Sequence, residues 1–172
     1  MNKINLYIFD IDGVVADITH RLHYMREKNY EKFYSDEELA KDEEIASGID
    51  LVNRLFESDD SFVMFMTGRP KSSDEATWKW LNEHKVKHSQ MGLFRADGDY
   101  RPSPIVKVEG VKQAVAEVKD ILDKVSKDGS MGDVELGDVY FIDDDPKNVQ
   151  AVEEKYPDIT GIVFTTKRME KE

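Results

Sequence analysis

Short apolar, β-rich segments alternate with helical patterns along this chain, and that alternation constrains the fold more than any other feature. The clearest strand candidate covers residues 4–9 (Ile-Asn-Leu-Tyr-Ile-Phe) and stops at an acidic turn. Three similar segments follow at residues 61–66, 138–142 and 159–164, and a weaker one covers residues 89–94. Strands that alternate with helices imply parallel pairing, so the sequence predicts an α/β fold with a doubly wound sheet.

Three helix starts lie between these strands, at Ser72, Ser103 and Asp145. Ser72 is followed three residues later by Glu75, which is a capping-box pattern. Ser103 and Asp145 each precede a proline, the residue that suits the first position of a helix. The helix after Ser103 carries an apolar stripe at 4-3-4-3 spacing, formed by Val111, Val115, Val118, Leu122 and Val125. In such a sheet, ligands bind beyond the carboxyl ends of the strands.

Residues 15–48 interrupt this alternation. The stretch 26–44 is dense in Lys, Glu and Asp with aromatic residues between them, and we interpret it as a small helical insertion that covers one side of the site. A chain of 172 residues without repeats, low-complexity tracts or linkers favours a single domain over residues 1–172. The tail, residues 165–172, is expected to be solvated.

The composition limits the ligands and the compartment. With 36 acidic and 24 basic residues the net charge is −12, which argues against broad binding to long nucleic acid strands but allows a local basic pocket for one phosphate. The absence of cysteine excludes disulfides, thiolate metal sites and cysteine nucleophiles. The apolar run at residues 4–9 is too short for a membrane span or a signal sequence, so we expect a cytoplasmic protein.

The first chemical motif is the pair Asp10 and Asp12, directly after the first strand and before Gly13. Two carboxylates this close destabilise each other unless a cation lies between them or one is protonated. A hard ion such as Mg²⁺ prefers oxygen ligands and would bring a phosphate with it. The alternative is an acidic turn in which Asp12 and Gly13 only end the strand.

The second and third motifs could hold a phosphate. Thr67, Gly68 and Arg69 end the next strand ahead of a helix, and their hydroxyl and backbone N–H groups suit an anion. An ordinary strand-to-helix turn is the alternative. Lys107 lies one turn before Val111 on the apolar stripe, where its ammonium either reaches an anion or only extends to the edge of the core.

The fourth motif is Asp143, Asp144 and Asp145, between a buried strand and a helix. Asp145 can serve as the N-cap of that helix. A metal ion would explain the other two acids at the end of the strand.

Together these motifs, in the order Asp-x-Asp, Thr-Gly-Arg, Lys, Asp-Asp, resemble the haloacid dehalogenase (HAD) superfamily of phosphotransferases over nearly the whole chain. The resemblance implies a HAD-like Rossmannoid fold with a small cap, and a phosphatase with an aspartyl-phosphate intermediate. It makes Asp10 the nucleophile and Asp12 the general acid and base, with Thr67 and Lys107 holding the phosphoryl oxygens. It also implies a Mg²⁺ held by Asp10, Asp143 and Asp144 and by the backbone carbonyl of Asp12. Position favours Asp144 over Asp143 as the direct ligand, and Asn148 lies where many relatives carry another acid.

Two further stretches, residues 94–102 and 16–21, are similar to the phosphatase domain of polynucleotide kinase–3′-phosphatases. The order Arg95, Asp99, Arg101, Lys107 matches that family, which removes 3′-phosphates from nucleic acid ends. The resemblance implies a substrate with a terminal nucleotide. The residues expected to contact it, or to line the entrance, are Gly68, Arg69, Arg95, Arg101, His20 and Arg21. A Gly-x-x-x-x-Gly-Lys-[Ser/Thr] loop, which the kinase half would need, is absent from the sequence.

Three alternatives remain open at this point. A phosphatase for sugar phosphates or 5′-nucleotides is disfavoured by the short insertion, because small substrates usually need a larger lid to exclude water. A phospho-accepting receiver-like module would need a lone Asp at the end of the strand at residues 61–66. A metal-dependent nuclease would leave Thr67 and Lys107 without a role.

Overall fold

In the computed structural model, which describes residues 1–167, five parallel strands form one sheet in the order β5-β4-β1-β6-β7. The strands are β1 (Asn2–Phe9), β4 (Ser61–Pro70), β5 (Gly92–Arg95), β6 (Val134–Asp143) and β7 (Ile159–Val163). β1 lies at the centre because its side chains are apolar on both faces, as a strand covered on both sides requires. The predicted parallel α/β sheet is confirmed, although β6 begins at Val134 and not at the expected residue 138.

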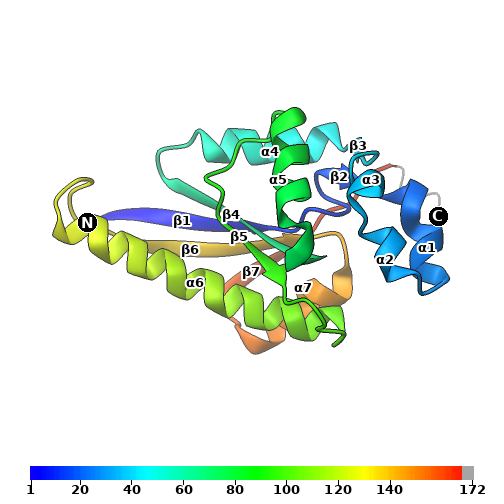
Figure 1. Cartoon of the computed structure of the whole chain (residues 1–172). Coiled ribbons are helices and arrows are strands. Elements are labelled where there is room, and N and C mark those ends of the chain that lie inside the picture. Colours follow the sequence, from blue (N-terminus) through cyan, green and yellow to red (C-terminus); the bar gives the residue numbers. More distant parts are fainter. Residues whose placement is uncertain (168–172) are drawn as a thin grey trace.

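Helices cover both faces of the sheet (Figure 1). One core cluster lies between the sheet and the pair α6 (Ser103–Lys127) and α7 (Pro146–Lys155). The other lies between the sheet and the pair α4 (Ala46–Phe56) and α5 (Asp74–Glu83). This two-sided layering is the doubly wound arrangement, and it leaves the carboxyl ends of the strands open beside the insertion.

The helix starts agree with the sequence in two of three cases. The Asp145 side chain accepts a hydrogen bond from the Lys147 N–H and caps α7, as predicted. α6 begins at Ser103 with Pro102 as its N-cap, one residue earlier than expected, and the predicted apolar stripe faces the core. The capping box at Ser72 is wrong, because Ser72 lies in a 3-10 turn and α5 begins only at Asp74.

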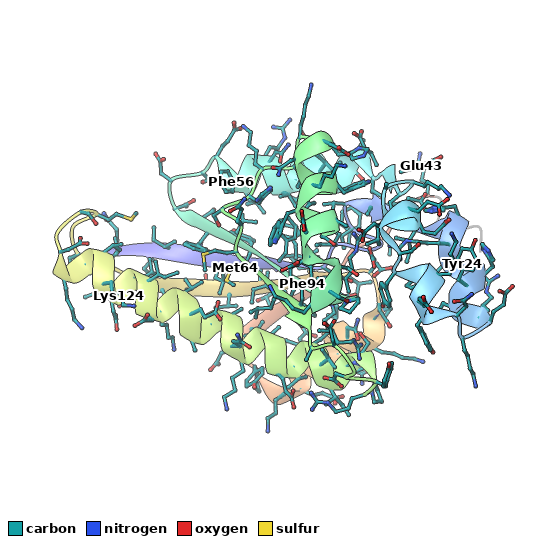
Figure 2. All side chains as sticks on the ribbon, in the orientation of Figure 1. Tyr24, Glu43, Phe56, Met64, Phe94 and Lys124 are labelled. Carbon is teal, nitrogen blue, oxygen red and sulfur yellow. The ribbon has the colours of Figure 1, made fainter. Side chains whose placement is uncertain are left out.

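The insertion between β1 and α4 packs at one end of the molecule, where Tyr24 and Glu43 are labelled in Figure 2, far from Lys124 at the other end. It contains a 3-10 turn and three short helices: η1 (Thr19–Arg21), α1 (Leu22–Arg26), α2 (Tyr30–Phe33) and α3 (Asp36–Leu39). A two-stranded antiparallel ribbon of β2 (Ala16–Asp17) and β3 (Glu43–Glu44) closes it at its base. The insertion is thus helical with a β ribbon and ends before Ala46, because residues 46–48 already belong to α4.

Within residues 1–167, none of the helices combines the length and the apolar character needed to cross a membrane. Of the tail expected to be solvated, residues 165–167 follow β7, and residues 168–172 lie outside the described part of the chain.

Candidate active site

Three neighbouring strands bring the predicted motifs together. β1 leads into Asp10, β4 carries Thr67 near its end, and β6 ends at Asp143. Since β4 and β6 flank β1 in a parallel sheet, their carboxyl ends meet at one edge, and the three side chains are almost fully buried there.

Lys107 joins these strands from the first turns of α6. Its Nζ atom donates to the carbonyl of Met66 at 2.8 Å and lies 2.9 Å from Asp10 Oδ1 and 3.1 Å from Asp143 Oδ2. Burial by itself would lower the pKa of Lys107. The negative charges of Asp10 and Asp143 have the larger, opposite effect, so the pKa is raised overall and the ammonium stays charged. The predicted contact between Lys107 and an anion is therefore present within the protein itself.

Asp10, Asp143 and Asp144 each offer an oxygen, and these oxygens lie within 4.8 Å of one another. Burial raises the pKa of Asp10 well above its usual value; Lys107 lowers it, and the charge of Asp143 raises it further. Burial and the charge of Asp143 raise the pKa of Asp144 to about 7. Two buried carboxyl groups and one half-buried one facing one ammonium therefore hold more negative charge than the protein compensates.

The residues around this cluster fit a divalent cation. The Asn148 amide donates to Asp143 Oδ2 at 3.1 Å, while Asn148 Oδ1 is buried without a partner among the described residues. Gly13 has φ +79, and a Cβ there would lie 2.1 Å from Asp144 Oδ2, so glycine leaves the space that Asp144 occupies. Oxygen ligands of this kind suit Mg²⁺, and Asp10, Asp143 and Asp144 are the side chains that would hold it.

Asp12 lies in a different electrostatic environment. Its Oδ1 atom accepts from Arg69 Nε at 2.9 Å, from Arg69 Nη2 at 2.6 Å and from Arg21 Nη2 at 3.2 Å. Burial by itself would raise the pKa of Asp12. The positive charges of Arg69 and then Arg21 have the larger, opposite effect, so the pKa is lowered overall. Both arginine side chains are fully buried and also bind the buried carboxylate of Asp42.

Asp10 and Asp12 share one feature despite this difference. Asp10 Oδ1 accepts from Lys107 and from the Ile11 N–H at 2.8 Å, and all the arginine contacts of Asp12 fall on its Oδ1. The described residues donate no hydrogen bond to Oδ2 of either side chain. One oxygen of each carboxyl group is thus anchored, and the other is left for a reacting group.

The predicted phosphate seat is built from Thr67 and Gly68. The Thr67 hydroxyl is fully buried and accepts from the Arg69 N–H at 3.1 Å, which leaves its hydrogen to donate. The Gly68 carbonyl accepts from Arg95 Nε at 3.3 Å and from the Tyr34 hydroxyl at 3.4 Å. Burial, followed by the charge of Asp12, raises the pKa of Tyr34 to about 12, so its hydroxyl stays a donor at neutral pH.

The residues expected to contact substrate lie in three settings. Arg21 and Arg69 are buried and occupied by Asp12 and Asp42, so the geometry gives them contacts with the protein instead. Arg95 is half-buried beside Gly68, whereas the half-exposed Arg101 pairs with Asp99 and Glu109. For Arg95 and Arg101, a role in substrate binding stays a prediction.

A cleft of about 980 Å³ runs from Gly13 and Asp144 along the insertion, and His20 lines it together with Ile18 and Lys41. The His20 ring lies 3.1 Å from the Glu38 carbonyl. His20 thus lines this cleft, whereas Arg21 is fully buried; a role of His20 at the entrance to the site stays a prediction.

Sequence reasoning missed Asp42 and Tyr34, which attach the insertion to the site. Both come from the charged stretch 26–44. In the sequence, nothing distinguishes Asp42, which binds two arginines, from the solvated acidic residues around it. A usable signal was the excess of basic residues next to the motifs, since buried Arg21 and Arg69 require acidic partners.

Comparison with known families gives one match. The family described as "Polynucleotide kinase PNKP phosphatase domain" matches residues 4–124, which run from β1 into α6. The match ends before Asp143 and Asp144, which the fold itself brings to the site. No curated protein matches the sequence.

Several solved structures share the fold. The structure of a Pnkp1/Rnl/Hen1 complex is similar over 94% of this chain and 46% of that chain, with 15% identity and a TM-score of 0.61. A second, the Pnkp1/Rnl/Hen1 RNA repair complex, is similar over 94% and 42%, with 15% identity and a TM-score of 0.63. The Class C acid phosphatase from Bacillus anthracis with tungstate bound is similar over 97% and 68%, with 14% identity and a TM-score of 0.56. The chain thus spans less than half the length of the two chains that it matches in the Pnkp1/Rnl/Hen1 structures.

Proposed function

The chain belongs to the polynucleotide kinase PNKP phosphatase domain family, a HAD-type phosphomonoesterase family, and from this premise we propose that it removes 3′-phosphates from nucleic acid ends or nucleotides. The observation that carries the proposal is the contact of Asp10 Oδ1 with Lys107, while Oδ2, at the edge of the sheet, accepts no hydrogen bond from residues 1–167. A carboxylate held in this way can act as a nucleophile.

In the proposed reaction, Asp10 Oδ2 attacks the phosphorus atom and the bond to the leaving oxygen breaks. Asp12 gives a proton to that oxygen. Water then attacks the aspartyl-phosphate, Asp12 takes a proton from it, and free phosphate leaves with Asp10 restored. The resting site favours ionised Asp12, so in this scheme it must gain its proton before the first step.

Charge compensation permits an anionic nucleophile to approach an anionic ester. Lys107 supplies one positive charge from within the fold, and Thr67 and the backbone beside it donate hydrogen bonds to the phosphoryl oxygens. Mg²⁺ held by Asp10, Asp143 and Asp144 would supply the further positive charge that the acidic cluster lacks.

The substrate class rests on the family and on the charge of the chain. One structural relative comes from an assembly named for RNA repair, which supports a nucleic acid end as the substrate. A net charge of −12 opposes binding to long strands, so the enzyme would hold only the terminal nucleotide. We infer that Arg95, half-buried beside the phosphate seat, contacts that nucleotide.

Phosphate release with Mg²⁺ tests this proposal on four substrates: a 3′-phosphorylated oligonucleotide, a 3′-nucleotide, a 5′-nucleotide and a sugar phosphate. We expect the highest kcat/KM for a substrate with a 3′-phosphate, and no turnover with Asp10→Asn. Asp145→Asn is the matched control, since asparagine caps α7 equally well and activity should persist. A preference of orders of magnitude for the sugar phosphate would overturn the nucleic acid assignment.

A further inference from the structure

The buried carboxylate of Asp42 links the insertion to the reacting groups. Asp42 precedes β3, and its side chain has no exposed surface. Arg21 donates to Oδ1 from Nε at 2.7 Å and to Oδ2 from Nη2 at 2.9 Å, and Arg69 Nη2 donates to Oδ2 at 2.8 Å. Asp42 therefore holds Arg21 by two bonds and Arg69 by one.

The same two guanidinium groups bind Asp12. The Nη2 atoms of Arg21 and of Arg69 each donate to both Asp42 Oδ2 and Asp12 Oδ1. Two carboxylates and two guanidiniums thus form a closed cluster, buried except at the partly exposed Asp12 side chain, in which the opposite charges balance. Arg69 is fixed further by a hydrogen bond from Nη1 to the Thr77 hydroxyl at 3.2 Å.

The cluster depends on Asp42, which belongs to the insertion. Without the Asp42 charge, two buried guanidiniums would face the single carboxylate of Asp12, and their mutual repulsion would be uncompensated. Arg21 would then keep only one bond to Asp12, at 3.2 Å, and a bond to the Phe33 carbonyl, at 3.2 Å. Arg69 would lose one bond but keep its bonds to Asp12 and Thr77, so Arg21 is the side chain that would shift most, and the Asp12 carboxyl group would lose a fixed partner.

We propose that Asp42 is a positioning residue, which orients Arg21 and Arg69 so that Asp12 Oδ1 is anchored and Oδ2 faces the oxygen of the leaving group. This inference rests on the proposed phosphatase reaction, in which Asp12 protonates that oxygen. The insertion then acts as a fixed part of the catalytic geometry and not only as a cover over the cleft.

A misplaced proton donor has a specific signature. An alkyl leaving group, such as the 3′-hydroxyl of a nucleotide, needs a proton as its bond to phosphorus breaks, whereas 4-nitrophenolate leaves without one. Loss of Asp42 should therefore lower kcat/KM for an alkyl phosphate much more than for 4-nitrophenyl phosphate. General loss of structure would lower both together.

The test compares Asp42→Asn with wild type on 4-nitrophenyl phosphate and thymidine 3′-phosphate, or on the alkyl phosphate that wild type hydrolyses fastest. We expect a loss of ~100-fold on the alkyl ester, in the usual range for proton transfer by a positioned side chain, and of less than about threefold on the aryl ester. The backbone carbonyl of Asp42 keeps its bond to Trp80 Nε1, at 3.0 Å, in this variant. Asp42→Glu retains the charge but shifts the guanidiniums, so it carries the test if Asp42→Asn does not fold.

Ser73→Ala is the matched control, because Ser73 also joins the core to the insertion, through the Tyr34 carbonyl, but lies outside the cluster. It should leave the ratio of the two kcat/KM values unchanged. Equal losses on both esters in the Asp42 variants would overturn the inference and leave the proposed function intact. A wild-type protein that hydrolyses no phosphomonoester would refute the proposed function itself.

Discussion

Asp10 and Asp12 are separated by a single residue, yet the charges around their carboxyl groups are arranged in different ways. Around Asp12, two guanidiniums balance two carboxylates inside the protein. Around Asp10, three carboxyl groups face one ammonium. The comparison teaches that folding alone completes the first cluster, whereas the second needs a cation or protons from outside.

The strongest test of the contrast removes the ammonium from the acidic cluster. Lys107→Ala should lower kcat/KM by ~1,000-fold, because both Asp10 and the phosphoryl group lose their fixed positive charge. Steady-state phosphate release measures this. Lys112→Ala, on an exposed turn of the same helix, should leave activity unchanged. A Lys107→Ala enzyme within tenfold of wild type would show that Lys107 only balances the resting charge.

Breaking the balanced cluster should instead destabilise the fold. Arg69→Met leaves Asp12 and Asp42 sharing Arg21, and the expected cost is about 3–5 kcal/mol of unfolding free energy. Urea denaturation in EDTA and in Mg²⁺ should give the same loss, since a cation does not complete this cluster. Arg54→Met, which breaks an exposed pair with Asp50, is the control and should change little. Restoration of Arg69→Met by Mg²⁺ would contradict the separation of the two clusters.

Unlike the cluster around Asp12, the acidic cluster of Asp10, Asp143 and Asp144 should be stabilised by a cation. Asp144→Asn removes one of three crowded charges, so in EDTA it should be at least as stable as wild type. Mg²⁺ should raise the Tm of wild type by several degrees and that of Asp144→Asn by less. Thermal unfolding with and without Mg²⁺ measures both effects. An equal Mg²⁺ response in the two proteins would place the cation elsewhere.

The carboxyl group of Asp144 also makes the stability of the fold depend on pH. Its folded pKa of about 7 lies above the usual 3.8, so between these values the folded state binds more protons than the unfolded state. The contribution of Asp144 to stability in EDTA is therefore present at low pH and is lost as the pH rises through 7. The free energy of unfolding, measured by urea denaturation at several pH values across this window, should fall with rising pH in wild type in EDTA. The fall should be smaller in Asp144→Asn and in wild type with Mg²⁺. A fall that Mg²⁺ leaves unchanged would point to another group.

The smallest effect concerns the contact between the insertion and the phosphate seat. Tyr34→Phe removes one long hydrogen bond to the Gly68 carbonyl, which Arg95 still binds, so the cost should be about 0.5 kcal/mol. Urea denaturation should detect it, with Tyr24→Phe as the control in the insertion. A loss several times larger would mean that Tyr34, like Asp42, fixes the site.

The sequence predicted those parts of the fold that depend on local pattern. The strand at residues 4–9 and the stripe around Val111 could be recognised because their neighbours in sequence show which faces are buried. α4 was missed because it follows the charged insertion directly, without a capping side chain at Ile45. Local patterns also indicated where the candidate site residues lie, since each motif ends a strand or begins a helix.

The partners of those residues could not be predicted, because they depend on contacts between distant segments. Arg69 was expected to face substrate, but pairing with Asp42, 27 residues away, places it in the interior. Residue type alone does not separate a buried arginine bound to carboxylates from an exposed one bound to phosphate. The distinction required the position of the insertion, which the charged stretch 26–44 does not encode in any short pattern.

The central place of β1 also affects how the protein is made. The strand before Asp10 pairs on one side with β4 and on the other with β6, which begins only at Val134, so it is synthesised before both of its neighbours. An apolar strand thus stays without one neighbour until most of the chain has been synthesised, and pairing of this range is slow. Asp10 is therefore synthesised well before the sheet around it is complete, so substitutions that weaken β6 should lower solubility during synthesis.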